Sequence, residues 1–177
     1  MPEQDSFRLL TPEEIPYFKC RTRVLEKVLA YWDGKRKGRR WPARPDIDPA
    51  EIKPLLPYIM LVDISRDPLR VRYRLVGTEI VRVSHFDFTG RYLDELIFES
   101  GETTDWTGFY RQVTEEGRPG FGIVHWQNEG AAHRWIEFLI CPLSSDDVTV
   151  DKCFSAEAYE PLNPLEFDSI GAALPPR

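Results

Sequence analysis

His125, His133 and Glu137 are the residues whose types could bind a metal ion, because two imidazoles and a carboxylate can hold iron or zinc. They meet only if the hairpin of residues 119–126 and 133–141 pairs with His125 opposite His133. That register needs a turn centred on Glu129 alone, and it also places Phe121 opposite Glu137.

A two-residue turn at Glu129 and Gly130 gives a different register of the same hairpin. It sets Ile123 opposite Ile136, Phe121 opposite Phe138, and His125 opposite Arg134. Because this register pairs apolar with apolar side chains, we favour it, and it separates the two histidines. The sequence therefore predicts no metal site.

Residues 77–96, "GTEIVRVSHFDFTGRYLDEL", contain the other candidates for chemistry. His85 and Asp87 are two residues apart, which on a helix points them away from each other, and no G-x-S-x-G motif is present. Gly77 and Gly90 are too far apart for a P-loop or a dinucleotide-binding fingerprint. We interpret the stretch as a joint in which Asp87 and Thr89 bond free backbone amides and Gly90 takes a positive φ. The chain is predicted not to be an enzyme, with no catalytic residues.

Composition narrows the class of protein further. A chain of 177 residues with 42% hydrophobic and 12% aromatic residues can form one well-packed domain. The net charge of -6 argues against nucleic acid as the main partner, although a basic run, Lys35 to Arg40, interrupts the acidic balance. We expect that run to be either a solvated linker or a surface for an acidic partner.

The three cysteines are widely spaced and unpaired, which suits a reducing compartment. No signal peptide and no apolar run long enough to span a bilayer is seen, so we expect a cytoplasmic protein without membrane insertion.

The elements that must position these residues follow from periodicity. A helix over 17–33 has one apolar stripe and stops near Gly34, and a second helix runs from Trp106 to Gly117. Strands are expected at 58–64, 71–76, 119–126, 133–141 and 148–157. We predict an α+β fold, a five-stranded antiparallel sheet with helices on one face and the N-terminal amphipathic helix able to cover the other. Residues 1–34 form a helical cap, 35–160 the core domain, and 161–177 a Pro-rich tail.

Three segments resemble motifs of a known protein family, and they occur in the same order as in that family. The segments "YWDGKRKGRRWPARPDIDPAEI", "YRLVGTEIV" and "DFTGRYLDEL" are similar to those of stand-alone bacterial PAS proteins of about this length. The resemblance covers roughly residues 20–160. It implies a PAS fold and a sensory or regulatory role, without implying a ligand. Where that pattern leads us to expect a glycine before D-x-TGR, this chain has Ser84, His85 and Phe86.

The residues predicted to converge between the sheet and the long helix are aromatic or apolar, with two polar residues beside them. They either fill the core or bind a small organic ligand. If Arg134 faces inward without a protein carboxylate, it favours an anionic ligand. The predicted ligand-binding residues are Tyr73, Leu75, Trp106, Phe109, Tyr110, Ile123, His125, Arg134, Ile136 and Phe138.

No cofactor is specified by the sequence. Flavin photosensors of the PAS kind resemble one another in a reactive cysteine on the helical side, where this chain has none. Haem-binding members commonly place a histidine on the long middle helix, and residues 102–116 contain none. The cofactor is therefore left as unknown.

Partners are expected to act by contact, since no output domain is recognised in the chain. A signalling protein such as a histidine kinase is the expected partner. Homodimerisation is expected through the N-terminal helix, with Leu25, Val28, Leu29 and Trp32 at the interface.

An alternative from another class is a small enzyme on a ketosteroid-isomerase-like α+β cone. That alternative needs a carboxylate as general base near a tyrosine inside the fold. Glu137 is the only plausible carboxylate on an inner strand of the predicted sheet. The favoured register points Glu137 outward.

Overall fold

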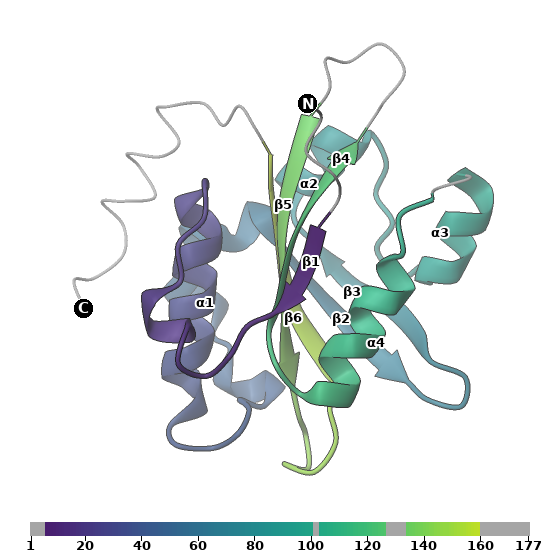
Figure 1. Cartoon of the computed structure of the whole chain (residues 1–177). Helices are drawn as coiled ribbons and strands as arrows, with labels where there is room; N and C mark the ends of the chain where they lie inside the picture. The colour runs from purple at the N-terminus through teal and green to yellow at the C-terminus, as the bar shows by residue number, and fades with distance from the viewer. Residues whose placement is uncertain (1–5, 101–102, 127–133, 160–177) are drawn as a thin grey trace.

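The computed structural model describes residues 6–100, 103–126 and 134–159, and within these not the side chains of 98–100, 126 and 134. One antiparallel sheet forms the centre, in the strand order β1-β4-β5-β6-β2-β3. Helix α1 packs on one face, here called the outer face, and α4 on the opposite, inner face (Figure 1). The strands are β1 (Ser6–Leu9), β2 (Ile59–Ser65), β3 (Arg70–Val76), β4 (Gly120–Trp126), β5 (Arg134–Leu143) and β6 (Lys152–Tyr159). The helices are η1 (Ile15–Tyr17), α1 (Arg23–Arg36), η2 (Arg44–Asp46), η3 (Pro49–Tyr58), α2 (Thr78–Ser84), α3 (Leu93–Ser100) and α4 (Trp106–Glu116).

The sheet has six strands, so the prediction of five was one short. The additional strand, β1, pairs antiparallel with β4 and sets Phe7 opposite Gly122. Its four residues alternate between exposed and half-buried positions, a pattern too short to be recognised in sequence. The five other strands lie where the sequence predicted them, within a few residues.

Helix α1 begins later and ends later than predicted. It continues through Gly34 to Arg36 and is closed by Lys37, whose φ of 50° is left-handed. Its apolar stripe lies on the outer face, where the Trp32 indole donates a 2.8 Å hydrogen bond to the Pro142 carbonyl oxygen of β5. The four residues predicted to form a dimer interface are buried in this contact: Leu25, Val28, Leu29 and Trp32. The protein's own sheet therefore occupies them, and an interface between copies would need another surface.

A β-bulge at Arg74 changes which face the end of β3 presents. Val62 is opposite Tyr73, but the next residue back along β2, Leu61, is opposite Leu75, so Arg74 is the extra residue. One extra residue moves Leu75 to the other face from Tyr73, and Leu75 is 42% exposed. The prediction that Leu75 joins Tyr73 facing the long helix is wrong for this reason.

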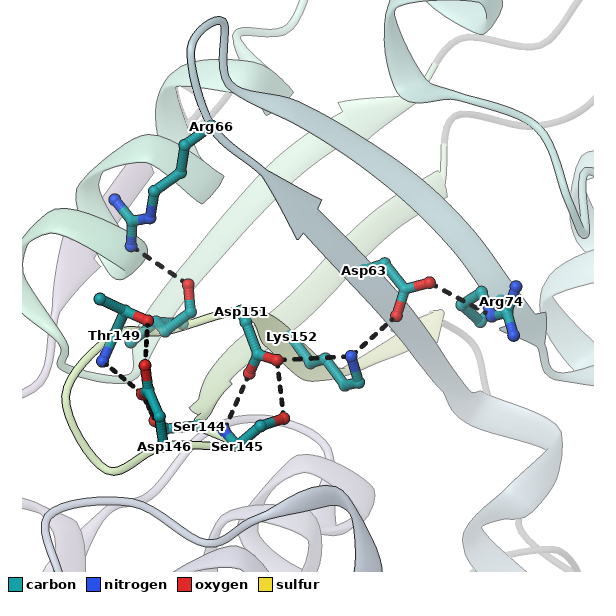
Figure 2. Close-up of polar contacts among 10 residues, drawn as sticks. Asp63, Arg66, Arg74, Ser144, Ser145, Asp146, Thr149, Asp151 and Lys152 are labelled. Carbon is teal, nitrogen blue, oxygen red and sulfur yellow. Dashed lines mark hydrogen bonds and ion pairs between the residues drawn. The ribbon is translucent and has the colours of Figure 1, made fainter.

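The connection from β5 to β6 is held by two aspartates (Figure 2). The Asp146 carboxylate accepts hydrogen bonds from the backbone amides of Val148 and Thr149, and Asp151 accepts them from the amide and hydroxyl of Ser145. The amides of Thr149 and Val148 are the main cause that lowers the pKa of Asp146 well below its usual range. These bonds fix the turn that brings β5 and β6 into register.

Replacement of Leu29 tests the packing of α1. Leu29→Ala should lower the free energy of unfolding by about 2–5 kcal/mol, because Leu29 is 1% exposed and its removal leaves a cavity. Ala30, the next residue, is exposed, so Ala30→Ser should change stability by about 0.5 kcal/mol or less. Urea unfolding of both variants measures the difference. Equal stability of the two would contradict this placement of α1.

Candidate functional site

The pairing of β4 with β5 differs from both registers considered in sequence. Ile123 is opposite Glu137, Gly122 opposite Phe138, and His125 opposite Trp135. The favoured register was wrong by one residue, and the turn itself, residues 127–133, lies outside the described residues. Because a shift by one residue exchanges the two faces of a strand, the side chains of β4 are placed opposite to the prediction.

Most of the predicted ligand-binding residues do gather on the inner face. The Phe138 ring from β5 lies 4.8 Å from the Trp106 ring and 5.4 Å from the Phe109 ring of α4, measured between centroids. Tyr110, also on α4, is fully buried, and its hydroxyl lies 3.4 Å from the Ser155 hydroxyl of β6. We call the following set the inner-face cluster: Tyr73, Trp106, Phe109, Tyr110, Ile136, Phe138, Ser155, Glu157 and Tyr159.

The remaining predicted ligand residues do not join the cluster. Ile123 and His125 lie on the outer face, where the His125 ring packs at a tilt against Trp135 and the Arg21 guanidinium lies over the same indole. Arg134 begins β5, but its side chain is outside what the structure describes, as is all of His133. Of the two expected polar anchors, His125 therefore lies on the wrong face, and the prediction for the Arg134 side chain is untested.

Glu137 is on the outer face, where it holds the residues before α1. Its carboxylate accepts hydrogen bonds from the backbone amides of Arg21 and Thr22 at 3.0 and 2.9 Å, and from the Thr22 hydroxyl at 2.8 Å. It is 2% exposed. Three donors satisfy this buried carboxylate, which explains how a charge can lie under α1. Glu137 does not reach the inner face.

Glu157 is the carboxylate that sequence reasoning missed. It is opposite Phe138 in the β5–β6 pairing, so its side chain leaves the sheet on the inner face. The Tyr159 hydroxyl donates a 2.5 Å hydrogen bond to one of its oxygens. Burial raises the pKa of the Glu157 carboxyl to about 7, and the Tyr159 bond offsets part of that rise. The predicted strand, 148–157, included Glu157, but the small residues Ala156 and Ala158 on either side did not indicate which face it occupies.

Phe7 was also missed. Its ring stacks on Phe109 at 4.5 Å and on Phe138 at 5.9 Å between centroids, so β1 contributes to the inner face. Gly120 leaves room for the Phe7 ring, which a Cβ there would meet. Gly122 leaves room for the Phe138 ring and for the Ser6 carbonyl oxygen, which would lie 2.7 Å from a Cβ. The alternating glycines of "GFG" at 120–122 were the sequence signal for such close packing.

The stretch 77–96 has the structure of a joint, as predicted. The Asp87 carboxylate accepts a 2.9 Å hydrogen bond from the Thr89 amide, and Gly90 has a φ of 87°. The Gly90 amide donates to the Tyr73 carbonyl oxygen, and the Phe88 ring packs edge-on against Tyr73 at 4.6 Å. The joint therefore fixes one end of the inner-face cluster.

The basic run is largely neutralised by acidic residues of the same chain. Lys35 pairs with Glu51, Arg36 with Asp33, and Arg39 with Asp46. Arg40 instead lies over the Trp41 ring and donates to the Glu116 carbonyl oxygen. Two surface pockets of about 300 and 400 Å³ share Arg40, and neither is lined by a residue of the inner-face cluster.

Within residues 6–100, 103–126 and 134–159, no group of three or more metal-ligating side chains is found. The same ranges contain no helix with the length and apolar character required to cross a bilayer.

The fold and this two-sided sheet agree with the family comparison. The model of the PAS domain family matches residues 20–156, and the chain belongs to that family. PAS domains are sensory and regulatory modules, and this is the class of function that the match supports.

Among solved structures, the chain is similar to one described as "Structure of an RNA-binding Light-Oxygen-Voltage Receptor". The identity is 16% and the TM-score 0.44, over 75% of this chain and 38% of that one. The chain thus spans well under half of that protein's length. No curated protein matches.

Adding a methyl group at Gly122 tests the approach of β1. Gly122→Ala should lower the free energy of unfolding by about 1–3 kcal/mol, because its Cβ has no room beside Phe138 and Ser6. Gly34→Ala is the control: no atom lies within 4 Å of its Cβ position in α1, so it should stabilise the protein by about 0.5–1 kcal/mol. Thermal or urea unfolding gives both values. A neutral Gly122→Ala would contradict the close approach of the Phe138 ring and the Ser6 backbone to Gly122.

The pH dependence of stability tests the burial of Glu157. Folding raises its pKa from 4.5 to about 7, so the neutral carboxyl is favoured in the folded state. The stabilisation is complete below about pH 4.5 and is lost as the pH rises through about 7. The wild type should therefore lose on the order of 1–3 kcal/mol relative to Glu157→Gln between about pH 5 and 8. Parallel curves for the two proteins in urea unfolding would show that Glu157 is solvated.

Proposed function

We propose that this chain is a non-enzymatic sensory or regulatory domain that binds a small organic molecule at the inner-face cluster. The bound state is passed on by contact with a signalling protein, such as a histidine kinase, in the cytoplasm. Homodimerisation is part of the proposal, through a surface other than the buried stripe of α1.

The observation that carries the proposal is the mixed character of the inner-face cluster. A pure packing core would be apolar and fully buried, but here Trp106 and Phe109 are only partly buried. The cluster also contains a carboxylate, Glu157, and the hydroxyl of Tyr73, a side chain that is 7% exposed. Partly open aromatic faces with a few convergent polar groups are typical of small-molecule sites.

The enzyme alternative loses its two specific premises. The chain has the PAS fold rather than a ketosteroid-isomerase-like cone. Glu137, its proposed base, lies on the outer face with three hydrogen-bond donors around it. The inner carboxylate is Glu157, and we assign it to ligand recognition.

A comparison of native and denatured masses tests the proposal directly. The purified protein should carry an excess mass that is lost on denaturation, because partly open aromatic and polar groups favour retention of a ligand. Trp106→Ala should reduce the ligand-bound fraction, because it removes a ring beside Phe138. Tyr17→Ala, at a residue 81% exposed and away from the cluster, is the matched control and should leave it unchanged. The same native spectrum reports the number of chains.

The outcome that contradicts ligand binding has two parts. The native mass would be that of the bare chain, and the melting temperature would not change with any of a panel of small aromatic amines, alcohols and acids. The sensory role would then rest on partner contacts alone.

A further inference from the structure

Glu157 is an acidic group without a cationic partner among the described residues of the chain. One oxygen accepts the Tyr159 hydroxyl, and the carboxylate keeps some exposure on the inner face. By contrast, the buried Glu137 on the outer face has three donors. A partly buried carboxylate with a single neutral donor leaves hydrogen-bonding capacity unused.

A second polar group with unused capacity is the Tyr73 hydroxyl. Its side chain is 7% exposed, and within the described ranges no hydrogen bond to that hydroxyl is present. The charge of Glu157 contributes to raising the pKa values of both Tyr73 and Tyr110, after the larger effect of their burial. The carboxylate and these hydroxyls therefore share one region between the sheet and α4.

The surroundings of this region are aromatic on several sides. Phe138 is the cross-strand neighbour of Glu157, and its ring contacts Trp106 and Phe109. Aromatic faces attract a cation, and a carboxylate attracts it further. An anion placed here would be repelled by Glu157. An anionic ligand was expected only if the inner face had no protein carboxylate. Glu157 is a carboxylate on that face, so this condition is not met.

We propose that the inner-face cluster recognises a small aromatic amine in its protonated form, with the ammonium group on the Glu157 carboxylate and the ring against the partly buried Trp106 and Phe109. The Tyr73 hydroxyl supplies a further hydrogen bond. This inference rests on the proposed ligand-binding function and specifies the chemical class of its ligand.

Among the described titratable groups of the inner-face cluster, Glu157 is the one whose charge changes near neutral pH. Burial raises the pKa values of Tyr73, Tyr110 and Tyr159, so these stay neutral hydroxyls. Burial likewise raises the pKa of Cys153, on the same face of β6. Two charged residues of α2 act on the pKa of Tyr159 in opposite directions: Glu79 raises it and Arg82 lowers it. Amine binding needs the ionised carboxylate, so affinity should rise with pH through about 7.

Three probes of similar size and different charge test the class of ligand on the full chain. The probes are 2-phenylethylamine, 2-phenylethanol and 3-phenylpropanoate. Titration calorimetry measures the dissociation constant of each. We expect the amine to bind most tightly and the acid most weakly. Glu157→Gln should weaken amine binding roughly ten- to hundredfold, because one charge-assisted contact is lost, and should affect alcohol binding much less. Glu115→Gln, an exposed position on α4, removes the same charge and should change nothing.

Two different failures are distinguishable. If the acid or alcohol binds as well as the amine, or Glu157→Gln binds the amine unchanged, the ligand class is wrong while ligand binding stands. If none of the three binds and the native mass is that of the bare chain, the proposed function fails and this inference with it. Circular dichroism of Glu157→Gln serves as the folding control, and the neutral side chain is expected to leave the spectrum unchanged.

Discussion

The pairing between β4 and β5 decides what each side of this sheet can do. With Gly122 opposite Phe138, the Phe138 ring occupies the space that a side chain at position 122 would fill, and it stacks on Phe7. With Ile123 opposite Glu137, the Glu137 carboxylate reaches the backbone before α1. A shift by one residue would send Glu137 toward α4 and Phe138 under α1, leaving a buried charge without its three donors. The register therefore holds both layers of helices in place.

The buried carboxylates on the two faces of the sheet differ in how many hydrogen-bond donors surround them. On the outer face, Glu137 is fully satisfied and its role is to fix the chain where α1 begins. On the inner face, Glu157 has one neutral donor among the described residues and a pKa raised by burial to about 7. Groups whose pKa is shifted away from its usual value are concentrated at functional sites. This contrast is the basis for assigning recognition to the inner face.

Much of the fold could be predicted because its signals are periodic. The stripe of α1, the helix ending at Gly117 and five of the strands follow from spacing and turn residues. Register could not be predicted, because the pairing partners are set by a turn whose sequence fits more than one geometry, and by a bulge at Arg74 that alternation does not reveal.

The errors in the candidate site follow from that register. Ile123 and His125 were assigned to the wrong face because β4 was shifted by one residue. Glu157 was missed because small residues precede and follow it, so hydrophobicity does not distinguish the two faces of β6. The aromatic residues of α4 were identified correctly as inward-facing, because helical spacing depends on no partner strand.

The bulge at Arg74 has a further effect at the free edge of the sheet. Strand β3 is last in the strand order, and an exposed edge of this kind can pair with the edge of another molecule. Here the edge is interrupted by the bulge and carries Arg70, Arg72 and Arg74, while residues 90–92 already bond the backbone of Tyr73 and pair with Arg72. Irregularity, charged side chains and a covering loop together oppose strand-to-strand aggregation, so the segment that shapes the inner face also protects the protein against it.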